Sequence, residues 1–142
     1  MFNVEWQRLE GVWTGSEQIT DGENNYEASG RLVFQTVFDG RFLLCDYVQT
    51  AATRPTAFAH GVFRWDDRSK ALTVTWFRSA SATPSQQTNA VSEADKLIFY
   101  ETVDARTTRT SYSLMMDRLS VYTDLVTGDD WKRIFEGTYR RH

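Results

Sequence analysis

Short segments rich in Val, Thr, Phe, Tyr and Trp alternate along the chain with clusters of Gly, Asp, Asn and Ser. They recur at a spacing of roughly 8–12 residues, which is typical of an all-β sandwich or barrel. Helical periodicity is confined to residues 3–10, where Val4, Trp6 and Leu9 predict a short helical turn ahead of the first strand. We therefore predict an all-β protein. Its expected strands cover residues 12–19, 27–38, 41–49, 57–65, 71–78, 86–91, 96–103, 107–116, 119–126 and 131–140.

The connections between these strands are short and carry turn residues. Asp39-Gly40 is the clearest hairpin signal, because a type I′ turn needs a positive φ at both central positions and these residue types tolerate it. No connection is long enough for a crossover helix, so successive strands should be antiparallel neighbours. A long meander usually curls shut, which removes its exposed edges. We predict an antiparallel up-and-down meander of about 8–10 strands, closed into a single barrel domain over residues 1–142.

Three adjacent segments, 41–49, 57–65 and 71–78, are apolar on both faces. In the first, both alternate sets are apolar: Phe42, Leu44 and Val48 on one side, Leu43, Cys45 and Tyr47 on the other. A wall that is covered on one side only would alternate apolar and polar residues. The second apolar face therefore needs a cover. That cover is either a second subunit, which makes the protein a homodimer, or the N-terminal segment and loops of the same chain.

Charge and residue usage exclude several classes of protein. Lys and Arg total 16 against 19 Asp and Glu, a net charge of −3 with a pI near 5.4, so neither a nucleic-acid partner nor a membrane partner is expected. Cys45 is the only cysteine, and His60 and His142 are the only histidines, which excludes an intrachain disulfide and Cys/His zinc spacings. The first residues lack the basic start and apolar run of a signal peptide. We expect a cytoplasmic protein.

Two motifs at the ends of the chain are similar to those of a known kind of barrel. Gly11-Val12-Trp13 opens the first strand, and the last strand ends in Tyr139-Arg140-Arg141. This pairing resembles lipocalin-like (calycin) proteins, in which a Gly-x-Trp at the barrel base is covered by an Arg from the terminal strand. A guanidinium stacked on the indole in this way would close the barrel floor.

A wider resemblance, to uncharacterised bacterial lipocalin-like proteins, covers most of the chain in order. The matching segments are Leu9-Glu-Gly-Val-Trp13-Thr-Gly15, Asp39-Gly-Arg-Phe-Leu43, His60-Gly61, Trp65-Asp66, Thr75-Trp76 and Gly137-Thr-Tyr-Arg140. In that family the Trp-bearing strand is often followed by Asp-Ser, whereas this chain has Arg78-Ser79. The family has no agreed activity, so the resemblance implies a fold rather than a function.

A related group of small barrels binds haem through a histidine and also begins with Gly-x-Trp-x-Gly. Here the strand continues Ser16-Glu17-Gln18-Ile19 without a further glycine, and neither histidine lies in a matching motif. The sequence therefore predicts no haem and no other cofactor.

His60 is the internal candidate for a general base. If the hairpin at 50–56 is centred near Ala52 or Thr53, Asp46 lies opposite or diagonal to His60 and can orient its imidazole. An enzyme that uses this pair on a barrel-bound substrate is one alternative function. The competing interpretation is a paired surface histidine, since no nucleophile elbow or phosphate-binding glycine loop accompanies the pair.

Residue alternation predicts a ligand cavity, because a closed barrel of this size has room for a small molecule. With a two-residue turn at Asp67-Arg68, Trp76 would face Ala59 and share a face with Phe63. An inward Glu101 would either orient the ligand or belong to a buried ion pair. The predicted lining consists of Cys45, Tyr47, Phe63, Trp76, Phe99, Glu101, Tyr112 and Leu114.

The leading hypothesis is therefore a barrel that binds a small, mostly apolar or aromatic molecule, with no chemistry assigned. Besides the His60 enzyme, a further alternative is a structural or interaction module whose barrel is filled by its own aromatic side chains.

Overall fold

The computed structural model describes residues 4–68, 70–93 and 96–142, without the side chains of 4–6 and 88–93. Within these ranges the chain forms a 3₁₀ helix and ten strands. Each strand overlaps one of the predicted segments, and the helical turn predicted over residues 3–10 is present over Val4–Leu9, with residue 3 outside the described residues. The bounds are η1 Val4–Leu9, β1 Gly11–Asp21, β2 Asn24–Val37, β3 Phe42–Ala51, β4 Arg54–Asp66, β5 Ala71–Arg78, β6 Ser85–Glu93, β7 Lys96–Val103, β8 Arg106–Met115, β9 Arg118–Thr127 and β10 Asp130–Arg141.

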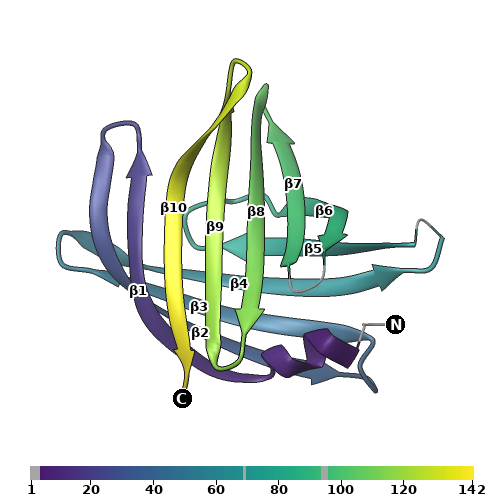
Figure 1. Cartoon of the computed structure of the whole chain (residues 1–142). Coiled ribbons are helices and arrows are strands. Elements are labelled where there is room, and N and C mark those ends of the chain that lie inside the picture. The colour runs from purple at the N-terminus through teal and green to yellow at the C-terminus, as the bar shows by residue number, and fades with distance from the viewer. Residues whose placement is uncertain (1–3, 69, 94–95) are drawn as a thin grey trace.

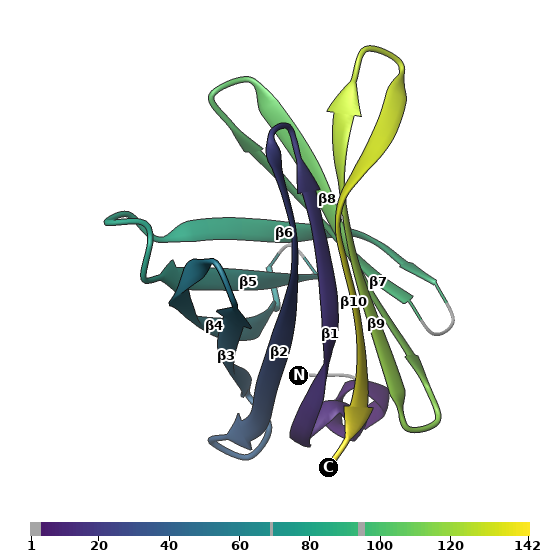
Figure 2. The same ribbon diagram turned by 90° about the vertical axis from the view of Figure 1, so that its left-hand side faces the viewer.

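The strands form one antiparallel meander that closes on itself (Figures 1 and 2). Each strand pairs with the next one along the chain, and β1 pairs with β10 from Trp13 opposite Arg141 to Ile19 opposite Phe135. This closure pairs both edges of the sheet. The predicted all-β, up-and-down barrel is confirmed.

The hairpin between β2 and β3 has the predicted turn chemistry. Asp39 and Gly40 both have positive φ, at 57° and 80°, and the Arg41 N–H donates to the Phe38 carbonyl at 3.2 Å. Positive φ at both central residues defines a type I′ turn, whose twist matches that of the strands it joins. The Asp-Gly pair thus sets the register of β2 against β3.

One end of the barrel is closed by η1 and by the last residues of β10, which lie together in Figure 1. Trp13 is fully buried there, and its indole N–H donates to the Leu9 carbonyl at 2.8 Å. The Arg141 guanidinium stacks on the indole and also donates to the backbone carbonyls of Arg8 and Glu10. The predicted cover of the first-strand Trp by a C-terminal Arg is confirmed, and this end is called the closed end below.

The register of β4 against β5 differs from the one assumed in the sequence analysis. Trp76 lies opposite Gly61 and Leu72 opposite Trp65, because Asp66 pairs with Ala71 and the turn is two residues longer than assumed. A shift of two residues keeps every side chain on its original face of the sheet. Trp76 therefore still shares the inner face with Phe63, and their ring centres are 6.0 Å apart.

Candidate functional site

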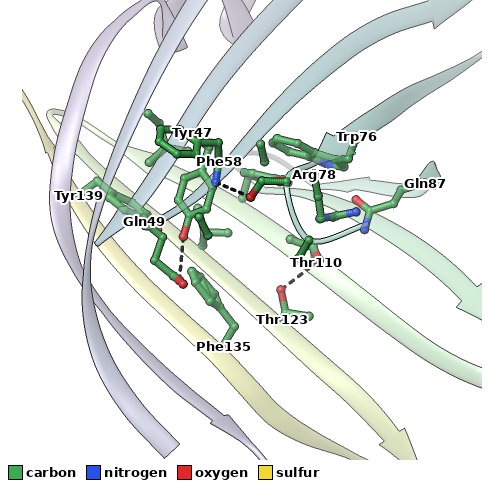
Figure 3. A pocket seen from close by; sticks show the side chains of 17 residues that line it. Tyr47, Gln49, Phe58, Trp76, Arg78, Gln87, Thr110, Thr123, Phe135 and Tyr139 are labelled. Atoms are coloured by element: carbon green, nitrogen blue, oxygen red, sulfur yellow. Dashed lines mark hydrogen bonds between the residues drawn. The ribbon is translucent and has the colours of Figure 1, made fainter. Parts of the chain in front are cut away.

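A cavity of about 270 Å³ occupies the half of the barrel away from η1 (Figure 3). It reaches the surface at Ser79 and Ala80, two exposed residues of the connection between β5 and β6. Its lining is mostly apolar or aromatic, with a minority of polar side chains. The lining residues are Leu32, Tyr47, Gln49, Ala57, Phe58, Ala59, Trp76, Arg78, Ser79, Ala80, Gln87, Thr110, Tyr112, Val121, Thr123, Phe135 and Tyr139.

The space exists because small residues of β4 face large ones on neighbouring strands. Ala57 and Ala59 contribute only methyl groups to the wall, and Gly61 contributes no side chain. A Cβ atom at Gly61 would lie 2.8 Å from the Trp76 ring, so the indole lies directly against the backbone of β4. This leaves a flat aromatic surface at the base of the cavity, suited to an apolar ligand.

One wall of the cavity is fixed by a buried acid. Glu17 is only 3% exposed, and its carboxylate accepts hydrogen bonds from the Tyr47 hydroxyl at 2.8 Å and the Gln49 amide at 3.0 Å. The Tyr139 hydroxyl donates to the same carboxylate. These four residues are called the Glu17 cluster. Gly30 makes room for it, because a Cβ there would lie 2.1 Å from Glu17 Oε2.

The two tyrosines of the Glu17 cluster stay protonated. Burial raises the pKa of Tyr139 and of Tyr47 well above the usual range, and the negative charge of Glu17 raises both further. Their hydroxyls therefore act as donors to Glu17 at neutral pH. The Tyr47 hydroxyl also accepts a hydrogen bond from the Gln49 amide at 3.0 Å. Hydrogen bonds therefore link the four side chains of the Glu17 cluster and fix their orientation.

A second polar group lies across the cavity and is less fully paired. Gln87 of β6 is 5% exposed, and its Nε2 donates to Glu101 Oε2 at 2.8 Å. Its Oε1 is buried and has no hydrogen-bond partner among the described residues. Arg78, two residues after Trp76, lines the same region and donates to Ser85 Oγ at 2.5 Å.

The predicted lining residues occupy three kinds of position. Tyr47, Trp76 and Tyr112 line the cavity. Glu101 is held at its edge through Gln87. The other four, which lie closer to the closed end, are packed in the hydrophobic core: Cys45, Phe63, Phe99 and Leu114. Alternation identifies which side chains point inward, but not how far along the barrel the packed core extends.

Phe63 shows how aromatic rings fill the closed half. Its ring centre lies 5.7 Å from that of Phe99 and 5.9 Å from that of Tyr112, each at a steep angle. Such edge-to-face contacts fill the interior closely. Cys45 is fully buried in the same core, and burial, followed by the charge of Asp46, raises the pKa of its thiol.

Asp46 and His60 are paired, on the outer face of the barrel. They lie opposite each other in the ladder between β3 and β4, with 2.7 Å between Asp46 Oδ1 and His60 Nδ1. Their side chains are 69% and 41% exposed, and neither lines the cavity. Because Ala59 points inward, the next residue must point outward. The pair flanks a separate shallow groove that includes Phe58 and Phe77.

Seven polar residues of the lining were not predicted: Gln49, Arg78, Ser79, Gln87, Thr110, Thr123 and Tyr139. Gln49, Arg78 and Thr110 each lie two residues from a predicted lining residue on the same strand, so the period-two pattern would have found these three. Glu17 had a further signal, since a charged residue within a strand is uncommon.

No group of three or more His, Cys, Asp or Glu residues suited to a metal ion occurs within residues 4–68, 70–93 and 96–142. In that same part of the chain, no helix is long and apolar enough to cross a membrane.

No protein-family model matches the chain, and no curated protein matches it either. The fold has a solved counterpart. The crystal structure of Rv2717c from M. tuberculosis is similar with a TM-score of 0.69, over 100% of this chain and 99% of that one. The two sequences are 18% identical, so the likeness shows the small β-barrel fold alone.

Proposed function

We propose that this protein binds a small, mostly apolar or aromatic molecule inside its barrel. The observation that carries the proposal is the cavity of about 270 Å³, which is lined mainly by apolar and aromatic side chains and opens beside Ser79. Ligand pockets are typically concave, mostly apolar and supplied with a few placed polar groups. This cavity has that composition.

The size of the cavity limits the ligand. Ligand pockets commonly measure about 300–1,000 Å³, so a cavity of about 270 Å³ suits a compact molecule of up to about three rings. The flat face of Trp76 on one side, with Tyr112 beside it, favours a planar ligand, because aromatic rings gain from stacked or edge-to-face contact.

The arrangement of the polar groups also supports binding. In an interior that only had to be filled, apolar side chains would serve, since a buried polar group is costly unless it is hydrogen-bonded. Here the Glu17 cluster orients Tyr47 and Gln49 beside the empty volume. A wall held rigid before the ligand arrives loses less entropy on binding.

The test is native mass spectrometry on freshly purified protein, followed by titration with the uncharged dye N-phenyl-1-naphthylamine. If the protein is purified with its ligand, we expect a non-covalent adduct with the mass of one small organic molecule. If it is purified empty, we expect the fluorescence of the dye to increase and to saturate as protein is added. Ala59→Phe, which places a ring in the cavity, should abolish dye binding.

Ala52→Phe is the matched control, because Ala52 is exposed in the turn between β3 and β4 and does not line the cavity. It should bind the dye as the unmodified protein does. Equal binding by both variants, or no binding of any apolar probe by the unmodified protein, would leave the barrel as a filled scaffold and overturn the proposal.

A further inference from the structure

The part of the cavity beside Gln87, Arg78 and Tyr112, called its polar end, contains polar groups that could bind a ligand. Gln87 is the clearest case: its Oε1 is buried with no hydrogen-bond partner in the described part of the chain, and its side chain lines the cavity. An unmet buried acceptor costs roughly 1–3 kcal/mol. Such a group in a native structure calls for an explanation, and a missing ligand is one.

The orientation of the Gln87 amide is set by its neighbour. Nε2 donates to Glu101 Oε2 at 2.8 Å, and an ionised carboxylate only accepts hydrogen bonds. The NH₂ group must therefore face Glu101, which leaves Oε1 on the other side of the amide. A flipped amide would set two acceptors against each other. The unpaired polar atom of Gln87, a residue that lines the cavity, is thus an acceptor and not a donor.

Two further groups complete this end. Tyr112 lines the cavity, and burial raises the pKa of its hydroxyl, which therefore stays protonated and can donate a hydrogen bond. Arg78 lies close by, since its positive charge acts on Tyr112 and its guanidinium bonds to Ser85, on the same strand as Gln87. Figure 3 draws Arg78 and Gln87 on one side of the cavity.

We infer that Gln87, Tyr112 and Arg78 form a head-group subsite for an uncharged ligand group that both donates and accepts a hydrogen bond, in the simplest case a hydroxyl on an aromatic ring. The ligand oxygen accepts from Tyr112 or Arg78, while its proton is donated to Gln87 Oε1. This inference rests on the proposed function, since the ring of the ligand occupies the apolar cavity.

A carboxylate fits this subsite less well, although Arg78 attracts negative charge. An ionised carboxylate has no proton for Gln87 Oε1, so two acceptors would face each other in a buried place. An ether or a bare hydrocarbon likewise leaves Oε1 unpaired. The subsite therefore selects for a hydroxyl, and buried polar groups of this kind discriminate strongly against analogues that lack it.

The experiment compares three two-ring probes by isothermal titration calorimetry at pH 7: 2-naphthol, 2-methoxynaphthalene and 2-naphthoate. We expect 2-naphthol to bind about tenfold more tightly than the methyl ether, the worth of one hydrogen bond. The carboxylate should bind most weakly. Gln87→Met should lower the affinity for 2-naphthol to that for the methyl ether, and it should leave the affinity for the ether unchanged.

Gln86→Met is the matched control, because Gln86 is the exposed neighbour of Gln87 on β6 and does not line the cavity. It should keep the full preference for naphthol. Tyr112→Phe gives a second test that keeps the ring, and it should weaken both naphthol and the ether. Thermal melts of every variant check that the barrel remains folded.

The outcomes separate this inference from the proposed function. One contrary outcome is that the ether binds as tightly as 2-naphthol, and another is that Gln87→Met leaves the preference for 2-naphthol intact. In either case the cavity still binds apolar ligands and the head-group inference is wrong. Tightest binding by 2-naphthoate, lost in Arg78→Met, would make the subsite a carboxylate site and overturn the inference too. No binding of any probe would contradict both.

Discussion

The guanidinium carbon of Arg141 lies 4.3 Å from the centre of the Trp13 ring, so the last strand closes over the first at the base of the barrel. The indole is fully buried, and its N–H is bonded to Leu9 of η1. One side chain thus joins β1, β10 and the N-terminal helix. Trp76, in contrast, is buried at the border of the cavity. Trp13 therefore belongs to the packed core at the closed end, whereas Trp76 lies where the core meets the cavity.

Trp13→Ala should lower the free energy of unfolding by about 3–5 kcal/mol, the usual cost of removing a fully packed Trp. Trp76→Ala should cost less, because one face of its ring already borders empty volume. Urea denaturation followed by circular dichroism measures both.

The Trp76 variant should also lose affinity for N-phenyl-1-naphthylamine. Equal and large losses of stability in the two variants, with dye binding unchanged, would show that Trp76 belongs to the core alone.

The Trp13 floor follows from the resemblance to lipocalin-like proteins, whereas local patterns are enough to predict the strands and the Asp39-Gly40 turn. These features depend on side-chain period and turn chemistry within short segments. Even the wrong turn length before Ala71 left Trp76 on the correct face, since the shift was by two residues.

The depth of the core and the polar contacts were not available from such patterns. Tyr139 and Glu17 are 122 residues apart in sequence and meet only because the barrel closes between β10 and β1. Gln87 lies on a strand with few apolar residues and a register shift between Asn89 and Val91, so its alternation is hard to read. The division between filled and open halves depends on how rings such as Phe63 and Phe99 pack together.

Tyr139→Phe tests the Glu17 cluster, since it removes one hydroxyl and keeps the ring. A hydrogen bond to a charged group contributes about 1.5–3 kcal/mol, and the variant should lose that much stability in urea denaturation. Tyr26→Phe is the comparison, because its hydroxyl donates to the neutral Gln49 Oε1, at 3.3 Å. It should lose about 1 kcal/mol or less. Equal losses of stability in the two variants would mean that the hydrogen bond from Tyr139 to Glu17 contributes no more than a hydrogen bond between neutral groups.

Asp124 should make stability depend on pH in the acid range. Burial opposes ionisation of this carboxyl, but hydrogen bonds and positive charge from Arg133 and Arg109 outweigh burial and lower its pKa. A pKa lowered by folding stabilises the protein above the unfolded value, about 3.9, and that stabilisation is lost as the pH falls through the folded value.

Asp124→Asn should therefore lower the free energy of unfolding by about 2 kcal/mol at pH 7, a moderate value because both arginines are partly exposed. The difference from the unmodified protein should shrink as the pH falls below about 4. Asp117→Asn is the control: its contact with Arg141 is 3.7 Å long and largely exposed, so little change is expected. A loss that stays constant down to pH 2 would contradict an electrostatic origin.

Cys45 should be inert while the barrel is folded. Its side chain is fully buried, and burial, with the charge of Asp46, raises the pKa of the thiol and so removes the reactive thiolate. With the thiol reagent DTNB, labelling should proceed only as the barrel opens, at a rate that stops rising with reagent concentration. Labelling in native buffer in proportion to the reagent would show that the cavity extends to Cys45, as the sequence analysis predicted.

The homodimer predicted from the doubly apolar sheet depends on the outer face of β3, β4 and β5. Phe58 and Phe77 are 56% and 48% exposed on that face. Large exposed apolar surfaces commonly mark interaction sites. Light scattering at micromolar concentration should then give about twice the 16.4 kDa of one chain, and Phe77→Ser should return the mass to that of a monomer. Met116→Ser, at a more exposed position in the turn between β8 and β9, should leave the dimer intact. A monomeric mass for the unmodified protein would mean that water, rather than a second subunit, contacts these two rings, and the apolar outer face would then need another explanation.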